Sequence, residues 1–208
     1  MKKFLLWLYQ TAFGKPAAVD KPLTSSAPSA VPALRVTFRA TEAFLSRVRA
    51  DLERRHAFAH ERVGFITVRA AEGAEGVTLI TEDYYPVADD DYVRDSSVGA
   101  MIGSEALRKA LELALLKGVG VFHTHMHGLS RHLWFSGVDL REQLKFVPDF
   151  FKVCPQMPHG AIVLNPKTAA GRVWLSPERV VKIDEFSTIG PRLVIDRAAR
   201  DGSTEFYI

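Results

Sequence analysis

The sequence is poor in cysteine, in long apolar runs and in blocks of charge of one sign. Cys154 is the only cysteine among 208 residues, so an internal disulfide and a Cys-x-x-Cys zinc pair are both excluded. The scarcity of cysteine fits a reducing compartment, so we expect a cytoplasmic protein. No apolar run approaches the roughly 20 residues of a membrane-spanning helix, so we expect no transmembrane segment. The 27 basic and 24 acidic residues are mostly interspersed, which argues against a nucleic-acid partner.

What is present is typical of a folded globular chain. Hydrophobic residues make up 47% and charged residues 25% of the sequence, and the length suffices for one well-filled core with appendages. Composition divides the chain into a short apolar segment at 1–13, a linker rich in Pro, Ala and Ser at 14–33, and one domain at 34–208. The apolar segment lacks the small-x-small cleavage site of an export signal.

Periodicity predicts a mixed order of helices and strands in the domain. A half-buried strand is followed by a helix, a hairpin, a second helix, a buried strand and a third helix, which Pro148 disturbs or ends. Further strands complete the sheet. The expected ranges are 34–39, 41–55, 61–68, 77–81, 105–117, 119–122, 139–147, 161–164, 172–175 and 179–183.

Four of the seven histidines lie between residues 123 and 139. His123 and His125 follow an apolar strand, and because side chains alternate along a strand, both imidazoles point to one face and can meet one metal ion. Asp139, at the start of a helix, can supply an oxygen as third ligand, with the Ser136 hydroxyl one turn earlier. Two imidazoles and a carboxylate leave a fourth position on zinc open for water, which is a hydrolytic ligand set.

A hydrolytic site also needs a proton acceptor that does not itself bind the metal. Glu61 is the leading candidate, because it begins a strand that can pair beside the strand ending in His123. A thiol site made from Cys154 and His159 is the competing hydrolytic interpretation, although a lone cysteine is usually buried and inert.

These residues carry a family resemblance. Glu61-x-x-Gly64-x-Ile66, His123-Thr124-His125 and Ser136-x-x-Asp139 together resemble the JAMM motif of the JAB/MPN (Mov34) metalloprotease family. The resemblance implies an α/β fold of the α+β type, with a curved, mostly antiparallel sheet, flanking helices and a layering similar to cytidine deaminase. It further implies Zn²⁺ held by His123, His125 and Asp139, with Glu61 as general acid/base and Ser136 assisting the oxyanion.

Family activity is the removal of ubiquitin-like proteins at their C-terminal glycine. The chain is similar to the JAB peptidases of bacterial ubiquitin-like conjugation operons, where a conjugating and an activating enzyme are further partners and antiphage defence is a frequent role. Deconjugation and precursor processing are both open. A non-catalytic MPN-type scaffold and a DNA-repair-associated relative of the same fold are the alternative functions.

The ligand pair can be chosen in two registers. We expect His123 and His125, because they lie at the end of the apolar strand, where the backbone is rigid. Ten residues then separate His125 from Ser136, more than is usual in the family. If His125 and His127 are the ligand pair, eight residues separate His127 from Ser136, which is closer to the spacing usual in the family. His127 and His132 would otherwise contact substrate or fill the loop.

Overall fold

The computed structural model describes residues 34–95, 97, 99–128, 133–197 and 205–207. The predicted segments 1–13 and 14–33 and the loop residue His132 lie outside the described residues. Ala33–Ile208 form a compact unit of their own. In the described part of the chain, no helix is both long enough and apolar enough to cross a membrane.

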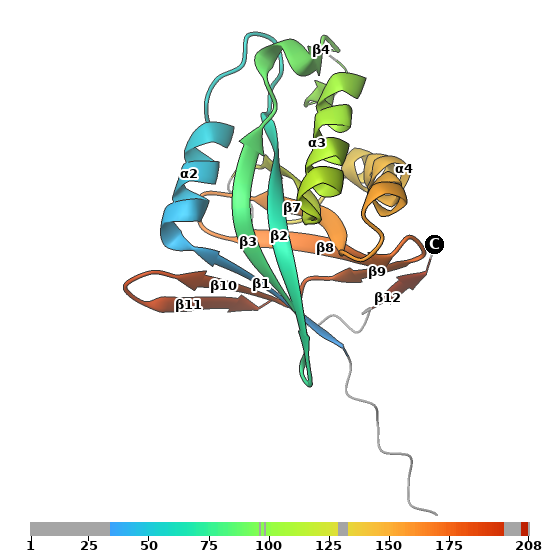
Figure 1. Ribbon diagram of the computed structural model, residues 1–208. Coiled ribbons are helices and arrows are strands. Elements are labelled where there is room, and N and C mark those ends of the chain that lie inside the picture. The colour runs from blue at the N-terminus through green and yellow to red at the C-terminus, as the bar shows by residue number, and fades with distance from the viewer. Residues whose placement is uncertain (1–33, 96, 98, 129–132, 198–204, 208) are drawn as a thin grey trace, which may run out of the picture. The chain divides into compact units, whose positions relative to one another are not determined.

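The main sheet has ten strands in the order β11-β10-β1-β3-β2-β6-β7-β8-β9-β12. Six of its strand pairings are antiparallel and three are parallel. The prediction of an α+β protein with a curved, mostly antiparallel sheet and flanking helices is confirmed (Figure 1). The strands are β1 (Arg35–Thr41), β2 (Val63–Gly73), β3 (Gly76–Pro86), β6 (Gly120–Met126), β7 (His159–Leu164), β8 (Ala169–Ser176), β9 (Arg179–Lys182), β10 (Glu185–Ile189), β11 (Leu193–Arg197) and β12 (Glu205–Tyr207).

Three α-helices occur in the described residues: α2 (Glu42–Leu52), α3 (Ser104–Lys117) and α4 (Gly137–Val153). A short 3₁₀ turn, Asp89–Asp91, and a two-stranded sheet of β4 (Tyr92–Val93) and β5 (Met101–Ile102) lie between β3 and α3. These elements connect the end of the β2–β3 hairpin to the helix that precedes β6.

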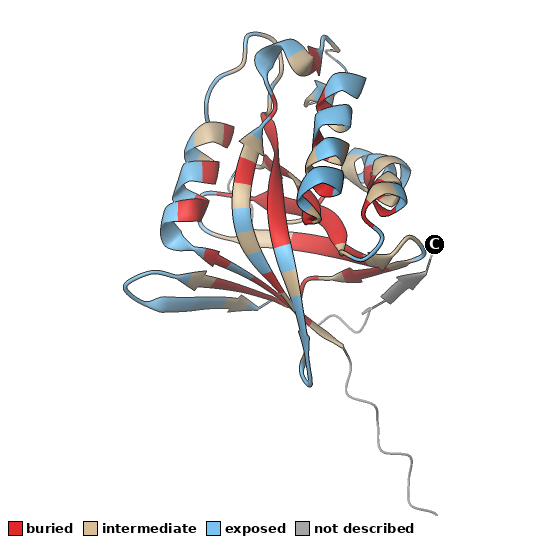
Figure 2. Ribbon diagram, in the orientation of Figure 1, coloured by how far each residue is buried: buried red, intermediate tan, exposed pale blue. Residues whose placement is uncertain are grey.

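The two faces of the central strands pack against different helices. Ile66 and Phe122 share one core cluster with the buried side of α2, whereas Phe65 and Val121 share another with α3 and α4. Figure 2 shows the first part of β2 buried for this reason, whereas its end towards the β2–β3 turn is exposed. Because alternation continues along β6, residues of the same parity as Val121 face α3 and α4. His123 and His125 therefore face the same side of the sheet as Val121.

The predicted end of the third helix near Val147 was wrong. Pro148 lies inside α4, which continues to Val153; Phe150 and Phe151, buried beyond the proline, supply the packing that offsets its missing hydrogen bond. In α3 the buried residues are Ala106, Ala110 and Ala114, with Leu107 and Leu111 partly buried against the same cluster, whereas Leu115 is 57% exposed.

Gly64 is required where β2 and β3 pair. A Cβ atom there would lie 2.3 Å from Cε2 of Tyr84, whose ring packs over the glycine. The Tyr84 hydroxyl donates a hydrogen bond of 2.6 Å to Asp51 of α2. Gly64, the glycine of the Glu-x-x-Gly pattern, therefore leaves room for the Tyr84 side chain, whose hydrogen bond connects α2 to the sheet near the start of β2.

Candidate metal centre

The histidines lie on and just after β6, in the middle of the sheet. β6 pairs antiparallel with β2, with His123 opposite Phe65 and His125 opposite Val63. His127 follows the strand, and its backbone N–H donates to the carbonyl of Leu164 at 2.9 Å. The two-residue spacing places all three imidazoles on the side of the sheet that α3 and α4 cover.

Three side chains converge beyond the end of β6. The Nε2 atoms of His125 and His127 are 3.1 Å apart. Asp139 Oδ2 lies 3.6 Å from Nε2 of His125 and 3.9 Å from Nε2 of His127. Donor atoms of Glu61, His125 and His127 also lie within 4.8 Å of one another. One small volume therefore collects two imidazoles and two carboxylates from three separate parts of the chain.

A capping box orients Asp139. Ser136 is the N-cap of α4; its Oγ accepts a hydrogen bond from the Asp139 N–H at 3.2 Å, and its own N–H donates to Asp139 Oδ2 at 2.7 Å. Burial raises the pKa of Asp139, but hydrogen bonds from His125 and Ser136 outweigh that effect and hold the pKa well below its usual value. The carboxylate is therefore charged and is held at the start of α4 by Ser136.

Glu61 is positioned by hydrogen bonds of its backbone and by the absence of a side chain at Gly99. It precedes β2 rather than lying in it, and the N–H groups of His60 and Glu61 donate to the carbonyl of Gly99 at 2.8 and 3.2 Å. A Cβ atom on Gly99 would be 3.0 Å from the carboxyl carbon of Glu61. The next residue, Arg62, is bound to Asp89 at 2.7 Å. This segment is thus fixed on both sides of the glutamate.

The residues present fit a divalent cation. Zinc–nitrogen bonds of about 2.0–2.1 Å in a tetrahedral centre place neighbouring donors about 3.3 Å apart, close to the separations of 3.1, 3.6 and 3.9 Å among His125, His127 and Asp139. Two imidazole nitrogens that face each other can share one proton, or both can direct lone pairs at one cation. These groups form a possible metal-binding site, and the donor set alone does not select the metal.

The predicted ligand His123 is not in this donor group. Its ring packs between Phe65 and Phe146, at centroid distances of 5.9 and 5.3 Å. Burial, together with the charge of His125, lowers its pKa to about 3, so the ring is neutral. The Nδ1 atoms of His123 and His125 are buried without a hydrogen-bond partner among the described residues. The geometry favours the register with His125 and His127 over the expected pair, whose role as ligands stays a prediction.

These groups line a cleft of about 650 Å³ between β6, α3, α4 and the segment around Gly99. Ile102, Leu107 and Phe146 make its apolar part, and Gln143 is 1% exposed with neither amide atom hydrogen-bonded within the described residues. Both Glu61 and Ser136 face this cleft. The site is therefore reached from a cavity large enough for several residues of an extended peptide.

Sequence reasoning missed two residues of this cleft. Gln143 follows Asp139 by four positions, one helical turn, and that spacing was a usable signal. No sequence signal pointed to Gly99, because its role depends on its closeness to Glu61, which no local pattern encodes.

The competing thiol site is not supported. Cys154 is buried, and burial raises the pKa of its thiol. His159 donates from Nε2 to the Cys154 carbonyl at 3.0 Å and accepts from the Val121 N–H at 3.1 Å through Nδ1. Both ring nitrogens are used for main-chain contacts, so His159 does not activate the thiol.

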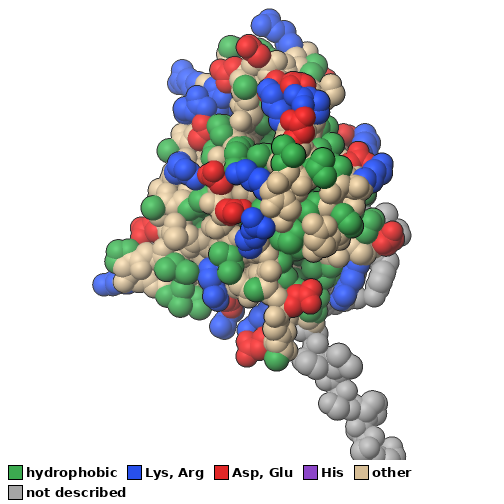
Figure 3. Space-filling view, in the orientation of Figure 1, with side chains coloured by type: hydrophobic (Ala, Val, Ile, Leu, Met, Phe, Trp, Pro, Cys, Tyr) green, Lys and Arg blue, Asp and Glu red, His purple; other side chains and the backbone are tan. Residues whose placement is uncertain are grey.

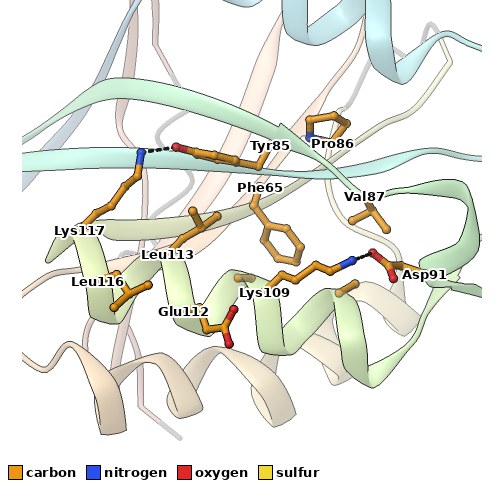
Figure 4. Close-up of a pocket in the computed structure, with 12 residues that line it drawn as sticks. Phe65, Tyr85, Pro86, Val87, Asp91, Lys109, Glu112, Leu113, Leu116 and Lys117 are labelled. Atoms are coloured by element: carbon orange, nitrogen blue, oxygen red, sulfur yellow. Dashed lines mark hydrogen bonds and ion pairs between the residues drawn. The ribbon is translucent and has the colours of Figure 1, made fainter.

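A second hollow lies on the other side of α3. It has a volume of about 340 Å³ and is flanked by a Lys117–Tyr85 hydrogen bond and a Lys109–Asp91 ion pair of 2.7 Å (Figure 4). Basic and acidic side chains also alternate over the face in Figure 3, in keeping with the interspersed charge of the sequence. Among the residues that the structure describes, no group of three metal donors lies in this hollow.

Comparison with known proteins adds little to this geometry. No family model matches the sequence, and no curated protein matches it. Among solved structures, the N-terminal domain of STIL from Trichoplax adhaerens is similar with a TM-score of 0.36 and 12% identity, over 66% of this chain and 41% of that one. The chain thus spans less than half of that neighbour, and so weak a likeness says nothing about function. The JAB/MPN resemblance stays a prediction.

Proposed function

We propose that this chain is a zinc-dependent peptidase or isopeptidase that cleaves after the C-terminal glycine of a ubiquitin-like protein, in a bacterial ubiquitin-like conjugation system. One observation carries the proposal: His125, His127 and Asp139 place three donor atoms within 3.9 Å of one another, and Glu61 lies beside them. Metal ligands together with one additional carboxylate are what hydrolysis of an amide requires.

Each residue has a proposed task. His125, His127 and Asp139 would hold zinc, which when bound supplies a Lewis acid and lowers the pKa of a coordinated water. Glu61 would accept a proton from the attacking water and return it to the leaving amine, as its position beside the two imidazoles allows. Ser136 would donate its hydroxyl hydrogen to the developing oxyanion, because its oxygen is already held by the Asp139 N–H.

The cleft suits a peptide substrate. An extended main chain presents alternating N–H and C=O groups, and Gln143 offers one unpartnered donor group and one unpartnered acceptor at the cleft wall. Ile102, Leu107 and Phe146 provide apolar surface for side chains on the same peptide. The partner proposed from these features is a ubiquitin-like protein with a flexible tail.

The test combines metal analysis with cleavage. The zinc-loaded full chain is incubated with a fusion of ubiquitin to a reporter through its C-terminal glycine, and with the same fusion of a bacterial ubiquitin-like protein. Glu61→Gln is expected to keep its metal and lose cleavage by about 10²–10⁴-fold, the usual contribution of a general base. Glu82→Gln, which changes an exposed carboxylate of β3, is the matched control and is expected to cleave like the parent chain.

The outcomes separate the alternatives. Zinc binding without cleavage of either fusion by the parent chain would refute the peptidase and leave the non-catalytic scaffold. Equal cleavage by the parent chain and Glu61→Gln would remove Glu61 from the reaction. A metal-free protein after incubation with excess zinc would refute the ligand set.

A further inference from the structure

Among the described residues, the outermost strand of the sheet is paired on one side only. β11 ends the ten-stranded sheet, and β10 is its only neighbour among the described strands. Backbone N–H and C=O groups along the other side of an edge strand are available to a further strand. Figure 1 shows this β10–β11 hairpin extending from the body of the sheet.

The side chains of this edge are unusually apolar. Leu193, Val194 and Ile195 are consecutive and are 63%, 51% and 43% exposed. Because alternate residues point to opposite faces, apolar surface is exposed on both faces of the edge. Strand β11 is accordingly coloured as largely exposed in Figure 2. Edge strands are normally protected by charge, and an apolar edge marks a surface that another chain covers.

We propose that the partner is a second copy of this chain, which adds its own β11 antiparallel to this one around a two-fold axis through Val194. In this register Leu193 lies opposite Ile195 of the partner subunit, and Arg192 lies opposite Asp196 of the partner subunit. The symmetry repeats each pair, so two ion pairs flank a continuous apolar centre. The inference concerns a surface away from the cleft and does not depend on the proposed peptidase activity.

The order of charged and apolar residues along β11 favours pairing with the same strand of a second copy. A basic residue, three apolar residues and an acidic residue follow one another from Arg192 to Asp196, and this order is complementary to itself when reversed. A two-fold axis through Ile195 instead places Val194 opposite Asp196 and Leu193 opposite Arg197, which sets charge against apolar groups. Pairing through so few residues buries less than the roughly 800 Å² per partner of a stable interface, so the dimer depends on concentration.

Sedimentation velocity of the full chain over a roughly hundredfold range of concentration tests the proposal. The mass is expected to rise from that of one chain, 23.1 kDa, toward twice this value. Val194→Lys puts two ammonium groups opposite each other on the axis and is expected to abolish dimerisation. Arg192→Asp and Asp196→Arg are each expected to weaken the dimer at least tenfold, and the double exchange is expected to restore it.

Controls separate pairing from folding. Arg47→Asp makes the same charge reversal at an exposed arginine of α2 and is expected to leave the dimer unchanged. The Asp196 charge also acts on Arg49, so the thermal unfolding of every variant is recorded. A parent chain that stays monomeric at all concentrations, a dimer indifferent to Val194→Lys, or a double exchange that does not restore association in folded protein would each overturn the proposal.

Discussion

Replacing His127 by alanine distinguishes the two possible sets of metal ligands. If His125, His127 and Asp139 bind zinc, the His127→Ala variant loses one of three protein ligands. If His123 and His125 are the imidazole ligands, the same change removes only a side chain near the cleft. For the matched variant His123→Phe the two expectations are exchanged: it loses a ligand only if His123 and His125 are the imidazole ligands.

The distances set the expected size of the effect. His127 Nε2 lies 3.1 Å from His125 Nε2 and 3.9 Å from Asp139 Oδ2, within the range of neighbouring ligands. Loss of a group that only supports a ligand lowers metal affinity by about 10–100-fold. Loss of the ligand itself is expected to exceed a hundredfold, or about 2.8 kcal/mol.

Zinc affinity is measured by competition with a chromophoric chelator at neutral pH. We expect the zinc affinity of His127→Ala to be more than about a hundredfold lower than that of the parent chain. The affinity of His123→Phe is expected to stay within about tenfold of the parent value. The phenylalanine variant keeps a ring between Phe65 and Phe146 and so avoids a cavity that alanine would leave. Thermal unfolding of the metal-free variants shows whether the fold is retained.

The opposite ranking would refute this reasoning. A large loss for His123→Phe together with normal affinity for His127→Ala would restore the pair expected from the sequence. Equal losses in both variants would mean that the separation of donor atoms does not identify the ligands.

Three further predictions follow from local packing and burial. Gly99→Ala places a Cβ atom 3.0 Å from the carboxyl carbon of Glu61, so cleavage of the ubiquitin fusion should slow at unchanged zinc content, and an unchanged kcat would contradict this. Gly64→Ala places a Cβ atom 2.3 Å from the Tyr84 ring and should destabilise the fold by about 1–3 kcal/mol in urea unfolding; an unchanged midpoint would count against it. Burial lowers the pKa of His159 from 6.5 to about 4, so the unfolded chain binds this proton first, and His159 should contribute a loss of about 3 kcal/mol in the free energy of unfolding as the pH drops across that window. His159→Asn should flatten that slope, and equal slopes would show that His159 does not cause it.

The candidate site was partly predictable because some of its geometry is local. Alternation along a strand places His123 and His125 on one face whatever surrounds them. The Ser136-x-x-Asp139 spacing is that of a capping box, and the structure contains this box with both hydrogen bonds. These features depend on residues a few positions apart, which interact in the same way in any globular fold.

Other features needed contacts between distant parts of the chain. The pattern could not say which two histidines approach Asp139, because that depends on where α4 begins relative to the end of β6. Pro148 was expected to disturb or end the helix, but burial of Phe150 beyond it outweighs the local preference.

The sequence by itself determined the order of helices and strands, the shared face of the histidines and the cap that orients Asp139. Tertiary structure decided that Glu61 reaches the same site, since Val63 pairs with His125 across β2 and β6. It also decided that Gly99 leaves room for the glutamate. The physical reason is that side-chain periodicity is a property of neighbouring residues, whereas the meeting of His125, His127 and Asp139 with Glu61 depends on strand register and helix packing over many tens of residues.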